Sequence, residues 1–198
     1  MFKTKIKKIG DSVNIGFQIP KEATSRKVVL AYFDLRKFSN VENSFDAKGT
    51  YQILNEMHEI ITDYVERLGG YCLRYIGDNT LAVFESESLM EVFLGIPRIK
   101  ELVDIYFHNL DLPSVLHVLL HIGQANIGLV GGKSNKRLDV SGEVLNELGY
   151  LMMRIDTSGN LGLFNSFCMS EVVYTDLEKP EGLKNIVVSD CKLFQFSK

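Results

Sequence analysis

The spacing of apolar residues changes along the chain and predicts alternating strands and helices. Residues 28–33 are apolar throughout, which is typical of a strand that is covered on both faces. Between residues 50 and 68 the apolar residues follow the i, i+3, i+4, i+7 spacing of an amphipathic helix, and Gly69 stands where a left-handed helix end is expected. Two apolar runs then flank Gly77, Asp78 and Asn79, which predicts a β-hairpin with a carboxylate at its tip.

The second half of the chain continues the same alternation. A helical pattern covers residues 90–106, and Pro97 is expected to kink or divide it. Residues 115–122 and 125–130 are predicted as two strands separated by a Gly-Gln pair, and helical spacing returns over residues 141–155. The rest of the pattern indicates a strand at 161–164, an amphipathic segment at 165–177, and short strands near 186–189 and 191–196.

The order of these elements from residue 28 to residue 130 is β-α-β-β-α-β. This order predicts an α+β fold, a ferredoxin-like antiparallel sheet with helices on one face. Residues 1–27 are polar and interrupted by glycine and proline, so we expect an N-terminal extension there and one domain over residues 28–198. The segments after residue 156 are expected to form a C-terminal extension that covers one edge of the sheet.

Composition and charge narrow the range of partners. The chain has 198 residues, is 45% hydrophobic and carries a net charge of −3, so no overall positive field attracts nucleic acid or an acidic membrane. No apolar run is long enough for a signal peptide or a membrane-spanning helix. Three cysteines without metal-site spacing fit reduced thiols. We therefore expect a cytoplasmic protein that binds neither nucleic acid nor membrane.

Three features are weak candidates for chemistry. The Gly-Lys-Ser run at 132–134 invites a P-loop interpretation, but the Walker pattern requires glycine at position 127, which is isoleucine. His117 and His121 project from the same face of a predicted strand, and without a third ligand nearby we expect ordinary sheet positions. His58 lies off the apolar stripe of its helix and is expected to be solvated.

Two aspartates are the strongest candidates for a functional site. Asp34 ends the first predicted strand, and Asp78 lies in the turn of the hairpin. The ferredoxin-like order places that strand beside the hairpin, so both carboxylates are expected at one edge of the sheet. Taken singly, each aspartate can also be read as a turn or cap residue. Two carboxylates at one edge form a site for hard divalent cations, which take oxygen ligands and share them with substrate phosphates. The pattern therefore favours phosphoryl or nucleotidyl chemistry.

Three segments of the sequence resemble the class III adenylate and guanylate cyclases. Residues 33–39 (FDLRKFS) are similar to the family segment that carries its first metal aspartate. Residues 69–84 (GGYCLRYIGDNTLAVF) are similar to the segment with the second aspartate, and residues 139–146 (DVSGEVLN) to the segment that binds base and ribose. The match spans residues 28–156 in the family's order. The resemblance implies the class III cyclase fold, with a catalytic domain over residues 28–198.

The resemblance also implies a role for each matched residue. Asp34 and Asp78 would hold two Mg²⁺ or Mn²⁺ ions per site, Asp139 and Arg74 would contact the base, and Asn146 would orient the ribose. In the family these groups come from opposite subunits, so the resemblance implies a head-to-tail homodimer with two interfacial sites. The implied reaction converts a nucleoside triphosphate, with ATP favoured, to a 3′,5′-cyclic nucleotide and pyrophosphate.

The loop after the first aspartate is implied to contact the substrate as well. The backbone carbonyl of Leu35 would help to hold the metal ions, and Lys37 and Phe38 would lie beside the triphosphate. Lys37 replaces a glycine of the family pattern, so its side chain either contacts a phosphate or crowds the loop.

Two further departures from the family pattern leave alternatives open. Arg74 replaces the lysine that reads the base, and Tyr150 replaces the arginine that stabilises the transition state. The cations available to substitute for that arginine are Arg154, Arg36 and Lys37. The alternatives to an adenylate cyclase are a cyclase for UTP or CTP, and a catalytically degenerate module that binds a nucleotide or only dimerises.

Overall fold

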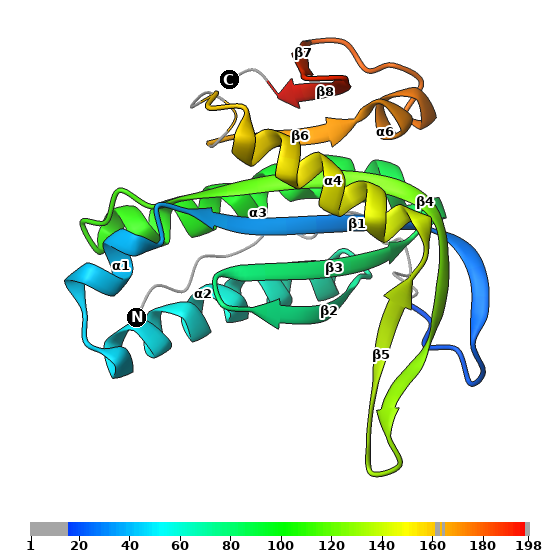
Figure 1. The fold of residues 1–198 in the computed structure, drawn as a ribbon, viewed down its shortest axis with the longest axis horizontal. Coiled ribbons are helices and arrows are strands. Elements are labelled where there is room, and N and C mark those ends of the chain that lie inside the picture. The colour runs from blue at the N-terminus through cyan, green and yellow to red at the C-terminus, as the bar shows by residue number, and fades with distance from the viewer. Residues whose placement is uncertain (1–15, 161–162, 164, 197–198) are drawn as a thin grey trace.

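Eight strands of the described residues form one sheet at the centre of the molecule (Figure 1). The structure is a computed structural model that describes residues 16–160, 163 and 165–196. The strands lie in the order β2-β3-β1-β4-β6-β8-β7, and β5 pairs with β4 outside this path. Among the described strands every pairing is antiparallel except that of β4 with β6. Their bounds are β1 Thr24–Arg36, β2 Tyr71–Ile76, β3 Asn79–Glu85, β4 Val115–Gly132, β5 Asn135–Ser141, β6 Phe167–Ser170, β7 Leu183–Val188 and β8 Cys191–Phe196.

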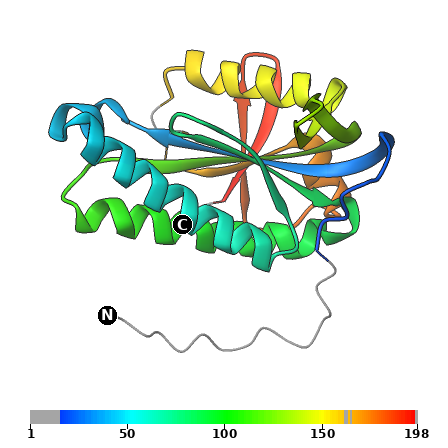
Figure 2. The same ribbon diagram turned by 90° about the horizontal axis from the view of Figure 1, so that it is seen from below.

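Helices pack on both faces of this sheet (Figure 2). The two helices of the βαββαβ unit, α2 (Ala47–Arg67) and α3 (Leu89–Asn109), lie side by side on one face, as predicted. The helix α4 (Glu143–Thr157), which follows that unit, packs on the other face. The predicted α+β fold with a ferredoxin-like antiparallel sheet is confirmed. The shorter helices are α1 (Ser39–Ser44), the 3-10 helix η1 (Ser86–Ser88) and α6 (Glu171–Asp176).

Strand β1 separates two apolar clusters because its side chains alternate between the two faces. Ala31 and Phe33 are fully buried in the cluster with α2 and α3, whereas Leu30 is fully buried in the cluster with α4. The strand also continues past residue 33, pairing with β4 as far as Arg36. By the same alternation Asp34 and Arg36 lie on the α4 face, so a polar pair directly follows the buried part of the strand.

The predicted break at Gly123 and the predicted division of a helix at Pro97 are wrong, and the alternative of a kink at Pro97 stays a prediction. Strand β4 runs unbroken through Gly123, because this residue and the next keep their pairing with β1. A side chain at Gly123 would stand 3.0 Å from Val144 of α4, so the glycine lets the helix approach the strand rather than ending the strand. Helix α3 is likewise undivided at Pro97, where Ile96 is fully buried and holds the helix against the core despite the lost hydrogen bond.

The basic, Gly-rich segment 131–137 belongs to a β-hairpin. Strands β4 and β5 flank a turn made by Lys133 and Ser134, and Gly132 pairs with Asn135. This hairpin projects away from the body of the sheet (Figure 1). Near its end Leu129 is 47% exposed and Val130 57% exposed, so the projecting arm presents apolar side chains to its surroundings.

The chain after α4 extends the sheet from β4 through β6, β8 and β7. The amphipathic segment at 165–177 contains both β6 and α6, and the strand predicted at 161–164 lies outside the described residues except for Leu163, which is helical. At the other end β1 begins at Thr24, so the expected boundary at residue 27 falls within a strand. Of the helices described, none is both long enough and apolar enough to cross a membrane.

Candidate functional site

Strand pairing brings Asp34 and Asp78 to the same edge of the sheet. In the register of β1 with β3, Asp34 faces Asn79, the residue that follows Asp78. Gly77 and Asp78 form the hairpin turn, and Gly77 has a φ of +59°, a left-handed angle that glycine adopts without steric cost. The Asp34 side chain is only 15% exposed. Near its end the first strand therefore lies beside the hairpin tip, and the carboxylate of Asp34 is mostly buried there.

His58 of α2 holds the hairpin tip in place. Its Nε2 lies 3.0 Å from the carbonyl oxygen of Gly77, and its Nδ1 lies 2.8 Å from Oγ1 of Thr80. Burial lowers the pKa of His58, so the ring is neutral at pH 7. Nε2 then donates to the Gly77 carbonyl, and Nδ1 accepts from the Thr80 hydroxyl. The expectation of a solvated His58 is wrong, because the hairpin packs over this part of α2.

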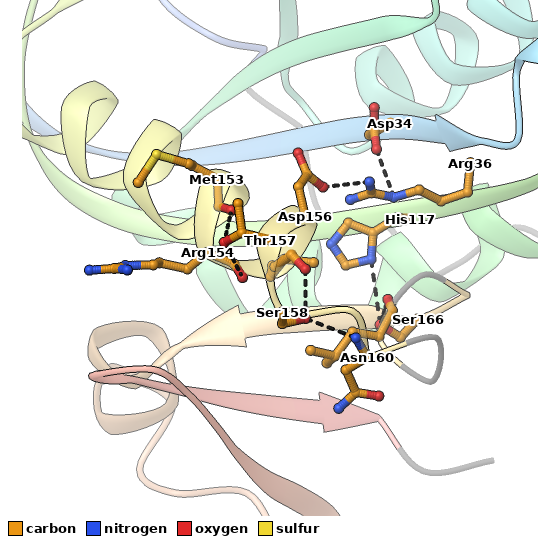
Figure 3. Close-up of polar contacts among 12 residues, drawn as sticks. Asp34, Arg36, His117, Met153, Arg154, Asp156, Thr157, Ser158, Asn160 and Ser166 are labelled. Atoms are coloured by element: carbon orange, nitrogen blue, oxygen red, sulfur yellow. Dashed lines mark hydrogen bonds and ion pairs between the residues drawn. The ribbon is translucent and has the colours of Figure 1, made fainter.

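A third carboxylate reaches the same edge from α4 (Figure 3). Nε of Arg36 lies 2.8 Å from Oδ2 of Asp34, and Nη1 lies 2.5 Å from Oδ1 of Asp156. The Arg36 side chain is 14% exposed and that of Asp156 is 51% exposed. One guanidinium therefore bridges a carboxylate of β1 and a carboxylate of α4.

The surroundings of Asp34 and Asp78 disfavour the ionised form of their carboxyl groups. Burial raises the pKa of Asp34 to about 6, against the opposing effect of Arg36 and with smaller contributions from Asp78 and Asp156. Burial also raises the pKa of Asp78. Carboxylates in this condition are stabilised by an added cation.

The donor set fits Mg²⁺ or Mn²⁺. Within the part of the chain that the structure describes, no cluster of three or more His, Cys, Asp or Glu side chains is arranged to hold a metal. A cation at Asp34 and Asp78 would therefore have few protein ligands. Mg²⁺ characteristically binds in this way, through one or two carboxylates, and completes its shell with water and substrate phosphates.

The loop after Asp34 has an unusual backbone. Lys37 adopts a φ of +63°, a left-handed angle that is disfavoured for residues with a Cβ atom. Its carbonyl oxygen accepts hydrogen bonds from the Asn40 amide at 2.9 Å and from the Ser114 hydroxyl at 3.2 Å, which hold the strained turn. Leu35 is buried within β1 and Phe38 is half-buried at the start of α1. Glycine is the residue best suited to the position that Lys37 occupies.

Arg74 and Asp139 form an ion pair between β2 and β5. Nε and Nη2 of Arg74 lie 2.9 Å and 2.6 Å from Oδ1 of Asp139, and Nη2 also donates to the Val140 carbonyl at 3.3 Å. The two side chains are 29% and 18% exposed. The two residues that the resemblance assigns to the base thus touch each other, although 65 positions separate them in the sequence.

Asn146, Tyr150 and Arg154 share one face of α4, since each lies four positions after the last. Asn146 and Tyr150 are exposed. Arg154 donates to the Tyr150 hydroxyl, lies over the Tyr150 ring at 4.7 Å from its centroid, and pairs with Asp190 at 3.5 Å. A guanidinium is therefore held one helical turn beyond the position where the family pattern has its arginine.

The predicted site residues do not all meet within the chain. Asp34 lies with Asp78 and, through Arg36, with Asp156 near the end of α4. Asn146 lies ten residues earlier in the same helix, about 15 Å away along its axis. Asn146 and the carboxylates paired with Arg36 are thus near opposite ends of α4.

Two residues of this region were not found from the sequence. Asp156 lies ten residues after the last matched segment, which ends at Asn146, and one charged residue near a helix end carries no pattern. His58 was recognised as a position off the apolar stripe, but its spacing contains no sign of the hairpin that covers it. Both become visible only when the strands are paired in space.

A separate cavity of about 600 Å³ lies between α3 and the end of β8. Its lining includes Pro97, Lys100, Phe167 and Phe196, and Nζ of Lys100 is paired with Asp104 at 2.6 Å. Neither Asp34 nor Asp78 lines this cavity, so it is separate from the candidate site.

His117 and His121 face α4 from strand β4. His117 is fully buried opposite Asp34, with Nδ1 3.5 Å from the Ser166 hydroxyl. His121 is 3% exposed, with Nδ1 2.8 Å from the Ser170 hydroxyl and Nε2 2.9 Å from Glu147 of α4. Both rings are thus enclosed between the sheet and the elements packed on it.

We expect His117 to make the protein sensitive to acid. Burial lowers the pKa of His117 to about 3, whereas an unfolded histidine titrates at about 6.5. The unfolded chain therefore binds this proton first as the pH falls, and the native state loses stability below about pH 6.5, by at most about 1.4 kcal/mol per pH unit.

The variant His117→Leu should lose this acid sensitivity, with a shallower decline of unfolding free energy in urea between about pH 6 and pH 4. The raised pKa of Asp34 has the opposite effect, because it makes the native state more stable as the pH falls. This effect is the same in the parent and the variant, so the difference between their slopes reports on His117 alone. Equal slopes for the two proteins would contradict the assignment.

We expect Lys37→Gly to stabilise the protein. Glycine removes the steric cost of the left-handed backbone at this position, about 1 kcal/mol, which urea denaturation measures. Lys37→Ala is the matched control, because it removes the same charge and keeps the Cβ atom. A glycine variant no more stable than the alanine variant would show that the backbone is not strained.

Solved structures of nucleotide cyclases share this fold over nearly the whole chain. The adenylyl cyclase CyaB from P. aeruginosa is 14% identical, with 89% of this chain and 96% of that chain covered and a TM-score of 0.72. A non-canonical dimeric guanylyl cyclase domain of the RhoGC fusion protein from Blastocladiella emersonii is 17% identical, with coverage of 88% and 96% and a TM-score of 0.70. The guanylate cyclase domain of RhGC from Catenaria anguillulae, in complex with GTP, is 15% identical, with coverage of 87% and 96% and a TM-score of 0.70.

No family model matches the sequence, and no curated protein matches it. The likeness is therefore one of structure, at low sequence identity. The chain has the fold of the class III adenylyl and guanylyl cyclase catalytic domains.

Proposed function

We propose that this protein is a nucleotidyl cyclase that converts a nucleoside triphosphate to a 3′,5′-cyclic nucleotide and pyrophosphate. In this reaction the ribose 3′-oxygen attacks the α-phosphorus, and the bond from that phosphorus to the oxygen of the leaving pyrophosphate breaks. The observation that carries the proposal is the meeting of Asp34 and Asp78 at one sheet edge, within a cyclase fold. Their raised pKa values support a site that gains stability from bound cations.

The metal site would consist of Asp34, Asp78 and the backbone carbonyl of Leu35, holding two Mg²⁺ or Mn²⁺ ions. Bound there, the ions would polarise the α-phosphate and stabilise the charge on the attacking and leaving oxygens. His58 serves this site by fixing the turn that carries Asp78. Lys37 and Phe38 lie in the adjoining loop, where Lys37 would contact a phosphate of the substrate.

The base and ribose would bind to Asp139, Arg74 and Asn146 of a second protomer. Asn146 is about 15 Å along α4 from the end that meets Asp34, so it cannot serve the carboxylates of its own chain. A head-to-tail homodimer brings one copy of each group together at two equivalent sites. The exposed apolar residues near the tip of the β4–β5 hairpin suit such an interface.

Arg154 would supply the positive charge that the family pattern takes from the position of Tyr150. Its guanidinium is held by Tyr150 and Asp190 on the exposed face of α4. The pair with Asp190 is exposed and therefore weak, so the arginine can exchange it for a phosphate oxygen at low cost. If Arg154 cannot reach the phosphate, the chain is a nucleotide-binding or dimerisation module with the cyclase fold.

The base specificity rests on the pair of Arg74 and Asp139. ATP is the favoured substrate, because an aspartate at position 139 accepts a hydrogen bond from an exocyclic amine. The planar guanidinium of Arg74 stands where the family pattern has the compact ammonium group of a lysine, which changes the shape of the base pocket. Two of the guanidinium's N–H donors already bond to Asp139. A cyclase for UTP or CTP is therefore the second candidate.

We predict that the purified protein with Mn²⁺ forms a cyclic nucleotide from at least one of ATP, GTP, CTP and UTP, identified by mass spectrometry. Asp34→Asn and Asp78→Asn should each lower the rate by about a hundredfold or more. Each substitution removes a negatively charged ligand of the metal ions that would bind the α-phosphate. Asp63→Asn is the matched control, because Asp63 is exposed on α2 and pairs only loosely with Arg67.

Two results would overturn this proposal. Cyclic product that persists at the parent rate in both aspartate variants would show that the metal site is elsewhere. A folded, dimeric protein that forms no product from any of the four nucleotides would identify the chain as the degenerate module.

A further inference from the structure

Arg36 forms an ion pair with Asp34, the carboxylate proposed to hold the divalent cation. Its Nε lies 2.8 Å from Oδ2 of Asp34, and the other end of the same guanidinium lies 2.5 Å from Asp156. Both Asp34 and Arg36 are about 85% covered, so neither charge is neutralised well by solvent. Figure 3 shows the guanidinium between the two carboxylates, over the buried ring of His117.

We propose that Arg36 is a positioning residue that competes with the divalent cation for Asp34 and transfers to Asp156 when the cation binds. The proposal rests on the proposed metal site, and it adds a role for Asp156 that the sequence does not indicate. In the metal-free protein Arg36 neutralises Asp34. When a divalent cation binds to Asp34, its positive charge repels the guanidinium of Arg36. Arg36 then leaves Asp34 and stays paired with Asp156.

The geometry suits this exchange because the guanidinium already touches both partners. Arg36 offers several donors in one plane, so it can give up its contact with Asp34 while it keeps the contact with Asp156. Asp156 is 51% exposed and lies near the end of a helix, where its side chain has room to move. The neutral ring of His117 below adds no competing positive charge.

The exchange involves helix α4, which also carries Asn146 and Arg154, the groups assigned to the second site of the dimer. Arg36 belongs to β1 and Asp156 to α4, so cation binding at Asp34 would strengthen the contact between this strand and this helix.

The experiment measures Mn²⁺ binding to the nucleotide-free protein by electron paramagnetic resonance, in a double-mutant cycle. The four proteins are the parent chain, Arg36→Gln, Asp156→Asn and the double variant. We expect Arg36→Gln to bind Mn²⁺ about fivefold more tightly or better, because the competing cation is gone. We expect Asp156→Asn to bind it several-fold more weakly, because the loss of the Asp156 carboxylate leaves Arg36 more strongly attracted to Asp34.

The decisive comparison is Asp156→Asn in the background without Arg36. If Arg36 mediates the effect, Asp156→Asn should change the affinity less than about twofold there. If Asp156 acts only through its own charge or as a direct ligand, the substitution weakens binding at least as much as in the parent, which overturns the proposal. Unchanged affinity in Arg36→Gln overturns it as well.

Two further variants keep the result interpretable. Arg36→Lys retains a positive charge that competes for Asp34, so its Mn²⁺ affinity should stay near that of the parent. This variant remains informative even if Arg36→Gln folds poorly. An Mn²⁺ affinity as tight as that of Arg36→Gln would count against the competition. Asp34→Asn should abolish tight binding, and equal binding by this variant and the parent would overturn both this proposal and the metal site. Asp34-dependent binding without any cyclase activity would overturn only the proposed function.

Discussion

The pairing of β1 between β3 and β4 is the constraint on which the site depends. It sets Asp34 opposite Asn79 on one side and opposite His117 on the other, next to the turn that carries Asp78. Because side chains alternate along a strand, the same register sends Phe33 and Leu35 into the core and Asp34 and Arg36 toward α4. A slip of one residue would turn the charged pair into the apolar cluster with α2 and α3 and remove Phe33 and Leu35 from it, so hydrophobic burial itself specifies where the carboxylate lies.

This arrangement places charge where water is scarce. Arg36 pairs with both Asp34 and Asp156, and burial holds the pKa of Asp34 near 6. Buried charges of this kind do not favour stability, and perturbed carboxylates are characteristic of functional sites. Helix α4 extends the arrangement across the face of the sheet, with Asp156 near one end and Asn146 near the other. The separation of these two residues is the physical reason why we propose a site that is shared between two protomers.

The sequence allowed the βαββαβ unit and the common sheet edge of both aspartates to be predicted, because burial patterns and the Gly-Asp turn are local signals. Its limits have physical causes. The unbroken β4 and α3 were not predicted, since backbone pairing and core contacts overrode the local effects of Gly123 and Pro97. The contacts of His58, Arg36 and Asp156 depend on side chains far apart in the sequence, which no spacing rule connects. The left-handed backbone of Lys37 fits the glycine that the family pattern has there.

The central claim is that the carboxylates of one protomer act with the α4 residues of another. Mixing Asp34→Asn chains with Asn146→Ala chains, after each variant alone has been measured, tests it most directly. Each variant should be inactive alone, whereas in the mixture half of the dimers pair unlike chains and carry one intact site, restoring about a quarter of the parent cyclase activity. A mixture that stays as inactive as its components, with exchange of chains verified by native mass spectrometry, would contradict the shared site.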